Sequence, residues 1–246
     1  MEALGIDVGG SGVKAAPVDL DTGERLETRL RIATPQPSTP EAVYAVFDQL
    51  IEHYRWDGAI GCALPSVVRS GVVYTAANID DGWIGRDVAT ELTERYSMPV
   101  SVVNDADAAG IAEQRFGEAR DLNGTVLLLT LGTGIGSAMF RDGALLPNTE
   151  LGHLEFKGMD AEHYAAARLV DEGGLKRREW AVRLNEYLNY VEDVLSPDHF
   201  ILGGGISKKF DDYSDLLDTT ATIRPARFRN RAGIIGAALA TEKETV

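Results

Sequence analysis

The sequence contains little cysteine and no long apolar run. Only one of its 246 residues is a cysteine, Cys62, which excludes an internal disulfide and any cysteine-rich zinc cluster. No run of about 18 apolar residues occurs, so we expect no membrane-spanning helix. The first ten residues have neither a basic start nor a long apolar stretch, so no signal peptide is expected. Together these absences predict a soluble cytoplasmic protein.

Positive charge is scarce as well. The chain has 24 basic and 38 acidic residues, a net charge of -14, which argues against general nucleic-acid binding. A polyanionic ligand would be repelled unless basic residues gather locally. They do so at Lys176-Arg177-Arg178, at Lys208-Lys209 and at Arg224, Arg227, Arg229 and Arg231. Guanidinium groups can bind phosphate oxygens in bidentate fashion, although a solvated surface is the other interpretation.

Apolar strands that alternate with helical segments predict an α/β fold. Thr39 is expected to cap the first helix and Pro40 to begin it, and Asp142-Gly143 is expected at the turn of a hairpin over 136–146. The other expected strands are 3–10, 12–20, 25–33, 58–65, 99–103, 125–134 and 199–205. The expected helices are 38–54, 85–96, 107–116, 178–195 and 231–242.

Glycines follow an apolar strand at three places. These turns are Gly9-Gly10-Ser11-Gly12, Gly132-Thr133-Gly134-Ile135-Gly136 and Gly203-Gly204-Gly205. Glycine lets backbone N–H groups approach a ligand. Ser11 and Thr133 add hydroxyl groups, and Lys14 is near the first turn. No Walker A pattern occurs, and any one of the three turns has a structural interpretation. Three turns at strand ends favour phosphate binding, because ligands of open α/β sheets gather there.

Carboxylates occur at two strand positions. Asn104 and Asp105 end a strand just before a helix. A helix cap needs only one of them, so the pair, followed by Asp107, leaves a carboxylate for general-base work. Asp7 lies in an apolar strand, where a carboxylate needs a cation or hydrogen-bond donors. Near phosphates, Mg²⁺ bound directly or through water would serve.

Acidic and imidazole side chains gather in residues 148–164. Glu150, His153, Glu155 and Glu162 could hydrogen-bond several hydroxyl groups of a sugar. The alternative is a polar surface loop that leads into a helix near Asp160. Zinc at His153 is not favoured, because no second histidine or cysteine is suitably placed.

Six segments together resemble the ROK (repressor, open reading frame, kinase) family of sugar kinases. In chain order they are GIDVGGSGVK, NDADAAG, LGTGIGSA, ELGH, GGGIS and AGIIGAA. The resemblance implies a two-lobed actin-like ATPase (ribonuclease H-like) fold with the active site in the interlobe cleft. The small α/β lobe would comprise 1–107, joined by the C-terminal helix 232–246, and the large α/β lobe would comprise 108–231.

The resemblance also implies roles for the residues singled out above. Asp105 would be the catalytic base, and Asn104, Asp105, Glu150 and His153 would contact the sugar. The segment DAEHYAAA points to Glu162 rather than Glu155 as the last sugar-binding residue. Asp7 would serve Mg²⁺. The phosphate-binding set would be Asp7, Gly9, Gly10, Ser11, Gly12, Lys14, Thr133, Gly134, Gly204 and Gly205.

The chain departs from the common family pattern in two respects. Most members carry a cysteine-rich zinc motif after the histidine, whereas here the segment is LEFKGMD, so no structural zinc is expected. Regulatory members carry a helix-turn-helix before the phosphate strand, with which this chain begins, so we expect no repressor role.

Several of these segments, with the tail from Ser196 to Leu239, are similar to one subgroup, the polyphosphate glucokinases. The expected reaction is phosphoryl transfer from inorganic polyphosphate to the 6-hydroxyl of glucose, with ATP left open as a further donor and a homodimer as the assembly. Some of the basic clusters would then line a path for polyphosphate that leads to the turn at Thr133. Two alternatives stay open, namely an ATP-dependent hexokinase for glucose, mannose, fructose or an amino sugar, and a non-catalytic sugar sensor.

Overall fold

The computed structural model describes residues 1–77 and 79–242. The chain divides into two compact units, which we describe separately. Unit 1 comprises Met1–Ala112 and Arg231–Val246, and unit 2 comprises Glu113–Asn230. Residues 243–246, the end of the expected C-terminal segment, lie outside the described residues.

Unit 1 is built on a five-stranded mixed sheet in the order β3-β2-β1-β4-β7. β1 pairs antiparallel with β2 and parallel with β4, and β4 pairs parallel with β7. The strands are β1 (Glu2–Gly9), β2 (Gly12–Asp19), β3 (Leu30–Ile32), β4 (Ile60–Leu64) and β7 (Val100–Asn104). A small hairpin, β5 (Val68–Arg69) and β6 (Val72–Val73), and a short 3-10 helix, η1 (Asp81–Trp83), complete this part.

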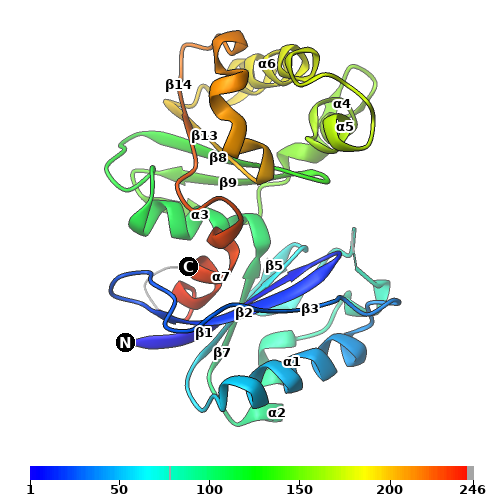
Figure 1. The fold of residues 1–246 in the computed structure, drawn as a ribbon, viewed down its shortest axis with the longest axis vertical. Helices are drawn as coiled ribbons and strands as arrows, with labels where there is room; N and C mark the ends of the chain where they lie inside the picture. The colour runs from blue at the N-terminus through cyan, green and yellow to red at the C-terminus, as the bar shows by residue number, and fades with distance from the viewer. Residues whose placement is uncertain (78, 243–246) are drawn as a thin grey trace. The chain divides into compact units, whose positions relative to one another are not determined.

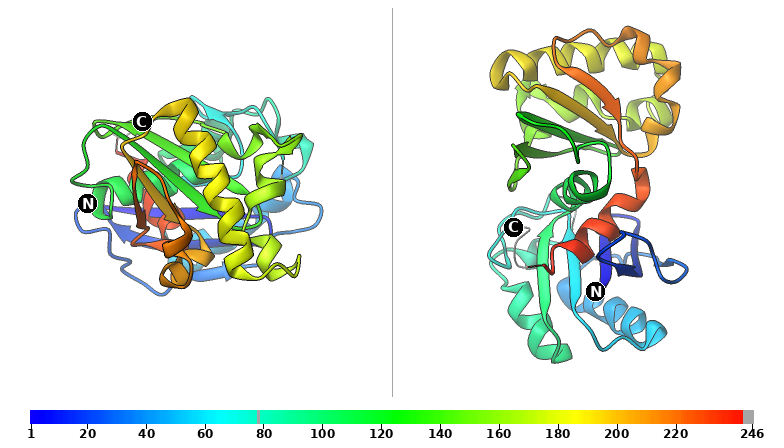
Figure 2. Two further views of the ribbon diagram at one scale, coloured as in Figure 1. Left: turned by 90° about the horizontal axis from the view of Figure 1, so that it is seen from above. Right: turned by 90° about the vertical axis from the view of Figure 1, so that its left-hand side faces the viewer.

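Helices cover both faces of this sheet (Figures 1 and 2). α1 (Pro40–Tyr54) and α2 (Val88–Tyr96) pack on one face, where Leu4, Ile6 and Phe47 are completely buried. The opposite face carries α7 (Ala232–Leu239), an almost entirely apolar helix. Alternate residues of β1 therefore serve two different layers, as the two-residue period of a strand requires.

α7 lies unusually close to the sheet. A Cβ atom at Gly61 of β4 would lie 1.7 Å from the carbonyl oxygen of Ala237, and one at Gly5 of β1 would lie 2.0 Å from that of Ile234. The helix backbone thus rests on the strand backbone, with no side chain in between. Only glycine permits this approach.

Unit 2 repeats the same strand order. Its sheet runs β10-β9-β8-β13-β14, with an antiparallel hairpin followed by parallel strands on the other side. The strands are β8 (Thr125–Leu131), β9 (Ile135–Arg141), β10 (Ala144–Leu146), β13 (His199–Gly203) and β14 (Thr222–Pro225). In chain order both sheets read 3-2-1-4-5, so the two units are variations of one topology.

The longest helix, α6 (Arg177–Leu195), runs across the sheet of unit 2 (Figure 2). Its residues Trp180, Leu184 and Leu188 are completely buried against the strands and short helices around it. α3 (Asp105–Phe116) begins in unit 1 and ends in unit 2. The short elements of unit 2 are η2 (Leu151–His153), β11 (Glu155–Phe156), β12 (Met159–Asp160), α4 (Ala161–Ala165), α5 (Arg168–Asp171), η3 (Gly205–Asp212) and η4 (Ser214–Leu216); η5 (Arg229–Arg231) leads back to unit 1.

The expected α/β fold is confirmed, as are Thr39 at the N-cap of α1, Pro40 at its first position and the turn at Asp142-Gly143. The strand expected over 25–33 is shorter, and only Leu30–Ile32 forms β3. The Tyr54 hydroxyl accepts the Leu30 N–H and lies 2.8 Å from the Ala15 carbonyl oxygen and 2.9 Å from that of Thr28. A side chain thus replaces backbone pairing at the start of the strand.

No described helix is long and apolar enough to span a membrane.

Candidate active site

The turn between β1 and β2 departs from the rule that the other two-residue hairpins of this protein follow. Ser70-Gly71, Asp142-Gly143 and Lys157-Gly158 all have positive φ at both central residues, as the type I′ turn that matches strand twist requires. Gly10-Ser11 has positive φ at neither. The three-residue turn between β8 and β9, Gly132 to Gly134, also lacks a positive φ, although such loops usually contain one.

Neither backbone conformation nor packing requires glycine at one position in each of the three glycine turns. Gly10, Gly132 and Gly205 do not have positive φ. A Cβ atom on any of them would meet no atom within 4 Å among the described residues. Close approach of a ligand to the backbone is a physical reason for glycine that remains.

Asp7 faces Lys14 from the neighbouring strand. Lys14 Nζ donates to Asp7 Oδ2 at 3.0 Å, and the Asp7 side chain is 14% exposed. Lys14 therefore supplies the cation that a half-buried carboxylate needs. A Cβ atom at Gly233 would lie 2.9 Å from Asp7 Cγ, so the start of α7 also packs on this carboxyl group.

The other two glycine turns lie together in unit 2. β8 and β13 are parallel neighbours, with Thr130 opposite Gly203. Gly204 has a φ of 82°, and a Cβ atom there would lie 2.1 Å from the carbonyl oxygen of Leu131. The turns that contain Thr133-Gly134 and Gly204-Gly205 therefore share one edge of the sheet, as predicted for strand ends. The turn of Gly9 to Gly12 belongs to unit 1.

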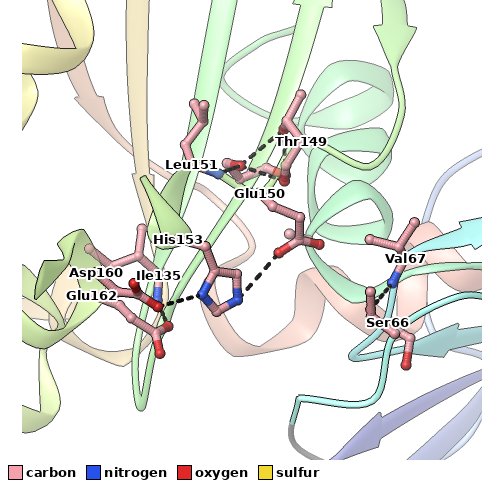
Figure 3. Close-up of polar contacts among 12 residues, drawn as sticks. Ser66, Val67, Ile135, Thr149, Glu150, Leu151, His153, Asp160 and Glu162 are labelled. Carbon is pink, nitrogen blue, oxygen red and sulfur yellow. Dashed lines mark hydrogen bonds and ion pairs between the residues drawn. The ribbon is translucent and has the colours of Figure 1, made fainter. Parts of the chain in front are cut away.

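Glu162 lies directly behind the turn between β8 and β9. Its Oε2 accepts the Ile135 N–H at 3.2 Å, and a Cβ atom at Gly134 would lie 2.3 Å from the same oxygen (Figure 3). The Arg168 N–H donates to the Gly132 carbonyl oxygen at 3.0 Å. One carboxylate and one backbone group thus hold this turn from the side of α4 and α5.

Asn104, and not Asp105, caps α3. The Asn104 Oδ1 accepts the N–H groups of Ala106 and Asp107 at 2.8 and 3.0 Å, which is the N-cap pattern. Its Nδ2 donates to the Ser66 carbonyl oxygen at 3.1 Å. Asn104 is buried, whereas Asp105, the first residue of the helix, is half-buried. The cap interpretation therefore holds for Asn104.

Glu150 and His153 lie on a segment fixed by a buried serine. Ser137 Oγ donates to the Thr149 carbonyl oxygen at 2.7 Å and accepts the Leu151 N–H at 3.1 Å. His153 lies with Nδ1 3.2 Å from Asp160 Oδ2 and Nε2 3.8 Å from Glu150 Oε2 (Figure 3). An imidazole between two carboxylates can hydrogen-bond or exchange protons with hydroxyl groups nearby.

The environment raises the pKa of Glu150. Desolvation is the main cause, and the Glu162 carboxylate adds to it, whereas His153 acts in the opposite direction. This electrostatic coupling brings together three of the predicted sugar-binding residues: Glu150, His153 and Glu162. All three belong to unit 2, while Asn104 and Asp105 belong to unit 1.

Sequence reasoning missed two residues near these groups. Asp160 approaches His153 only because the β11–β12 hairpin turns the chain back, and LEFKGMD gave no signal for that hairpin. Arg31, on β3, donates to the Ser11 carbonyl oxygen at 2.6 Å. Its signal was the alternation in RLETRLRIA, which places it on a definite face of a strand.

The basic clusters differ in how far protein carboxylates occupy them. Arg177 pairs with Asp212 at 2.7 Å and Arg178 with Asp215 at 2.9 Å, which ties the start of α6 to η3 and η4. Arg227 donates to the Phe116 carbonyl oxygen, and Arg224 lies 3.9 Å from Glu118. Lys208 and Lys209 of η3 are exposed and follow the Gly203-Gly204-Gly205 turn within a few residues.

Asp7 fits the role of a magnesium ligand. Its Oδ1 accepts no hydrogen bond from the described residues, and Mg²⁺ that binds phosphates typically takes only one or two protein carboxylates. No group of three His, Cys, Asp or Glu side chains suited to a metal ion occurs among the described residues.

Comparison with known proteins places these groups in context. The model of the ROK family matches residues 3–165. Polyphosphate glucokinases from Mycobacterium tuberculosis (strain CDC 1551 / Oshkosh) and Mycobacterium leprae are each 45% identical. The first alignment covers 98% of this chain and 92% of the relative, and the second covers 97% and 74%.

Solved structures agree in fold. The crystal structure of an inorganic polyphosphate/ATP-glucomannokinase from Arthrobacter sp. strain KM has a TM-score of 0.93 at 45% identity, with 99% of each chain covered. A ROK family glucokinase from Streptomyces griseus has a TM-score of 0.80 at 24% identity and covers 97% of this chain and 98% of its own. The fold is that of the actin-like ATPases, as expected. The chain belongs to the ROK family of sugar kinases.

Proposed function

We propose that this protein is a polyphosphate glucokinase, which transfers a phosphoryl group from inorganic polyphosphate to the 6-hydroxyl of glucose. The observation that carries the proposal is the 45% identity, over nearly the whole chain, with relatives of that name. The local geometry supports it, because the chain combines sterically open glycine turns with a carboxylate that its helix does not need as a cap.

Asp105 is the general base in this proposal. It accepts the proton of the 6-hydroxyl as that oxygen attacks the terminal phosphoryl group. The bond from this phosphorus to the bridging oxygen breaks, and the polyphosphate chain leaves shortened by one phosphate. Asn104, Glu150, His153 and Glu162 bind the other hydroxyl groups and so orient the sugar. Asp160 lies 3.2 Å from His153 Nδ1 and orients that imidazole. Positioning supplies most of the rate in phosphoryl transfer, since the transition state demands little covalent chemistry from the protein.

The glycine turns bind the donor. Backbone N–H groups at Gly9 to Gly12, Thr133-Gly134 and Gly204-Gly205 would stabilise charge on the phosphoryl oxygens. Lys14 adds a positive charge at the first turn. Asp7 would hold Mg²⁺, which neutralises phosphate charge when bound. We further propose a homodimer that acts in the cytoplasm, and light scattering coupled to size exclusion would measure the first of these.

The decisive experiment measures glucose 6-phosphate formation by the purified protein with Mg²⁺ and glucose. Nucleotide-free long-chain polyphosphate is compared with ATP. We expect product with polyphosphate alone. Product with ATP alone would replace the proposal with an ATP-dependent hexokinase, and the absence of product with both donors would lead to other sugars and then to a sensor role.

A second candidate is a kinase with broader donor and acceptor use. The structural relative at 45% identity is named a polyphosphate/ATP-glucomannokinase, so ATP as donor and mannose as acceptor belong in the same assay. A double substitution, Arg227→Ala with Arg229→Ala, tests the proposed polyphosphate path. We expect it to weaken polyphosphate use more than ATP use, and an equal loss with both donors would contradict that path.

A further inference from the structure

Two positive charges lie directly opposite each other beside the Gly10-Ser11 turn. β2 and β3 lie side by side (Figure 1). In their antiparallel pairing, Lys14 is the partner of Arg31. Directly opposed residues of a strand pair point to the same face of the sheet, and like charges in such a pair destabilise it. The repulsion between Lys14 and Arg31 therefore destabilises the pairing of β2 with β3 unless a negative charge lies nearby.

The protein offsets this cost only in part. Lys14 pairs with Asp7. Arg31 is exposed, and no carboxylate lies within 4.0 Å of its guanidinium among residues 1–77 and 79–242. Arg31 Nη2 donates hydrogen bonds to the carbonyl oxygen of Ser11 at 2.6 Å and to its hydroxyl oxygen at 3.4 Å. Only one of the two cations is therefore paired with a carboxylate, and Asp7, Lys14 and Arg31 together carry one excess positive charge.

The absence of a side chain at Gly12 leaves room for the guanidinium of Arg31 beside the turn. A Cβ atom at Gly12 would lie 2.5 Å from Arg31 Nε and 2.6 Å from Arg31 Cζ. Any larger residue at position 12 would therefore displace the guanidinium. The φ of Gly12 is not positive, so backbone conformation does not explain this glycine. The side chain is thereby held over the turn instead of extending along the strand.

The same segment fixes the turn from one side. Arg31 binds the Ser11 carbonyl oxygen, and Thr34 Oγ1 donates to the Gly9 carbonyl oxygen at 2.5 Å. Two carbonyl groups of the turn are thus occupied by side chains of the β3 segment. A Cβ atom at Gly10 between them would still meet no described atom within 4 Å. Two side chains thus hold the turn, and the space beside Gly10 stays open.

We propose that Arg31 and Lys14 form a paired phosphate-binding site at the Gly10-Ser11 turn, in which Arg31 binds phosphate oxygens of the donor. The inference rests on the proposed function, because that function supplies the phosphate chain. An anion placed against both cations removes the repulsion between them. The planar guanidinium can hold two oxygens at once, whereas the ammonium group of Lys14 acts as a point charge.

Direct binding tests this site without catalysis. Calorimetric titration measures the affinity of the full chain for inorganic tripolyphosphate and, in a second arm, for ATP. We expect Arg31→Ala to weaken tripolyphosphate binding by about tenfold or more, since a charge-assisted bidentate contact is lost. Arg31→Lys keeps the positive charge but loses the planar group that binds two oxygens at once. Its affinity for tripolyphosphate should therefore lie between those of wild type and Arg31→Ala. Arg29→Ala is the matched control, because Arg29 is an exposed arginine two positions away that lies outside β3.

The outcomes separate the inference from the proposed function. Wild-type binding that Arg31→Ala leaves within twofold overturns the inference, as does equal weakening by Arg29→Ala. Absence of wild-type binding to both anions, with no product in the glucose assay, overturns the proposed function instead. Weakening confined to tripolyphosphate assigns Arg31 to inorganic donors, and weakening with ATP as well assigns it to phosphates that both donors share.

Steady-state kinetics provide a readout that a merely structural role would not produce. For Arg31→Ala we expect a raised KM for the donor, with KM for glucose and the melting temperature unchanged. A raised KM for glucose, or a lowered melting temperature with the donor KM intact, would mean that Arg31 only supports the hairpin and would overturn the inference.

Discussion

At the scale of single residues, the division of work between Asn104 and Asp105 is the clearest feature of the candidate site. Asn104 accepts two N–H groups at the start of α3 and donates to the chain after β4. The helix is therefore capped without Asp105. The general-base role proposed for Asp105 therefore does not compete with capping of the helix.

Replacing Asp105 by asparagine removes the base and retains the shape. We expect kcat for glucose phosphorylation to fall by about 10²- to 10⁴-fold, the usual contribution of a general base. The variant should still fold cooperatively, since Asn104 caps the helix. The measurements are steady-state kinetics and thermal unfolding, with tripolyphosphate binding as a control. A kcat within tenfold of wild type would disprove the assignment.

Glu150 makes stability depend on pH, because its pKa in the folded state is raised. A raised carboxyl pKa favours the protonated form in the fold. Its stabilisation is complete below the ordinary value of about 4.3 and is lost as pH rises through the folded pKa. Glu150→Gln is neutral throughout, so we expect its melting temperature relative to wild type to rise between pH 4 and pH 7.

The size of this effect is limited by solvent. The Glu150 side chain is 38% exposed, so we expect less than about 1 kcal/mol in the free energy of unfolding. The same substitution should lower the affinity for glucose. Unfolding curves across pH measure the first effect, and a difference between the proteins that stays constant with pH would contradict the raised pKa.

At the scale of elements, the hairpins distinguish glycines that the backbone conformation requires from those that we propose to lie against a ligand. Gly143 has a φ of 83°, whereas Gly10 has no positive φ and no neighbour where a Cβ atom would lie. The two positions therefore make opposite predictions for the same substitution.

Gly143→Ala should lower stability by about 1–2 kcal/mol, because alanine is strained at positive φ, and should leave kcat/KM nearly unchanged. Gly10→Ala should leave stability within about 0.5 kcal/mol and raise the donor KM, because the methyl group occupies space beside the turn. Denaturant unfolding and kinetics on both variants provide the comparison. Equal effects of the two substitutions on stability would contradict this interpretation of the turns.

The sequence predicted elements better than it predicted contacts. The strand over 125–134 and the helix over 178–195 follow from apolar patterns within one segment, and both are present. Asp160 beside His153 and Arg31 over Gly12 depend on pairing between segments, which no local pattern encodes. The shortened β3 has the same origin, because Tyr54 comes from a helix that follows it in the chain.

The candidate site was predicted to a different extent in each part. Glycine turns and the Asn104-Asp105 pair were visible as residue types at strand ends. The chemistry of Glu150, His153 and Glu162 suggested a sugar site, but the choice over a polar surface loop depended on the resemblance. The structure adds that these three residues lie together in unit 2.

At the scale of the whole molecule, unit 1 depends on a helix from the far end of the described chain. Gly61→Ala would place a methyl group 1.7 Å from the Ala237 carbonyl oxygen, so α7 must move off the sheet. We expect a loss of roughly 1–3 kcal/mol or more in unfolding free energy. Hydrogen exchange should increase in unit 1 and remain nearly unchanged in unit 2.

Gly203→Ala is the matched control in the corresponding strand of unit 2. A Cβ atom there would meet its nearest neighbours at 3.6 Å, an ordinary contact distance. We expect its unfolding free energy to stay within about 0.5 kcal/mol of wild type. If the two substitutions destabilise the protein equally, the close packing of α7 is not what the Gly61 position requires.

The return of α7 to unit 1 also has a consequence for how the protein is made. The strands β1, β4 and β7 leave the ribosome before the whole of Glu113–Asn230, and the helix that covers their second face follows that segment. Unit 2 is one continuous stretch and can fold as soon as it has emerged, since domains generally fold as units. The unit that is begun first is therefore completed last, and one face of its sheet stays uncovered until the segment that contains α7 has been synthesised.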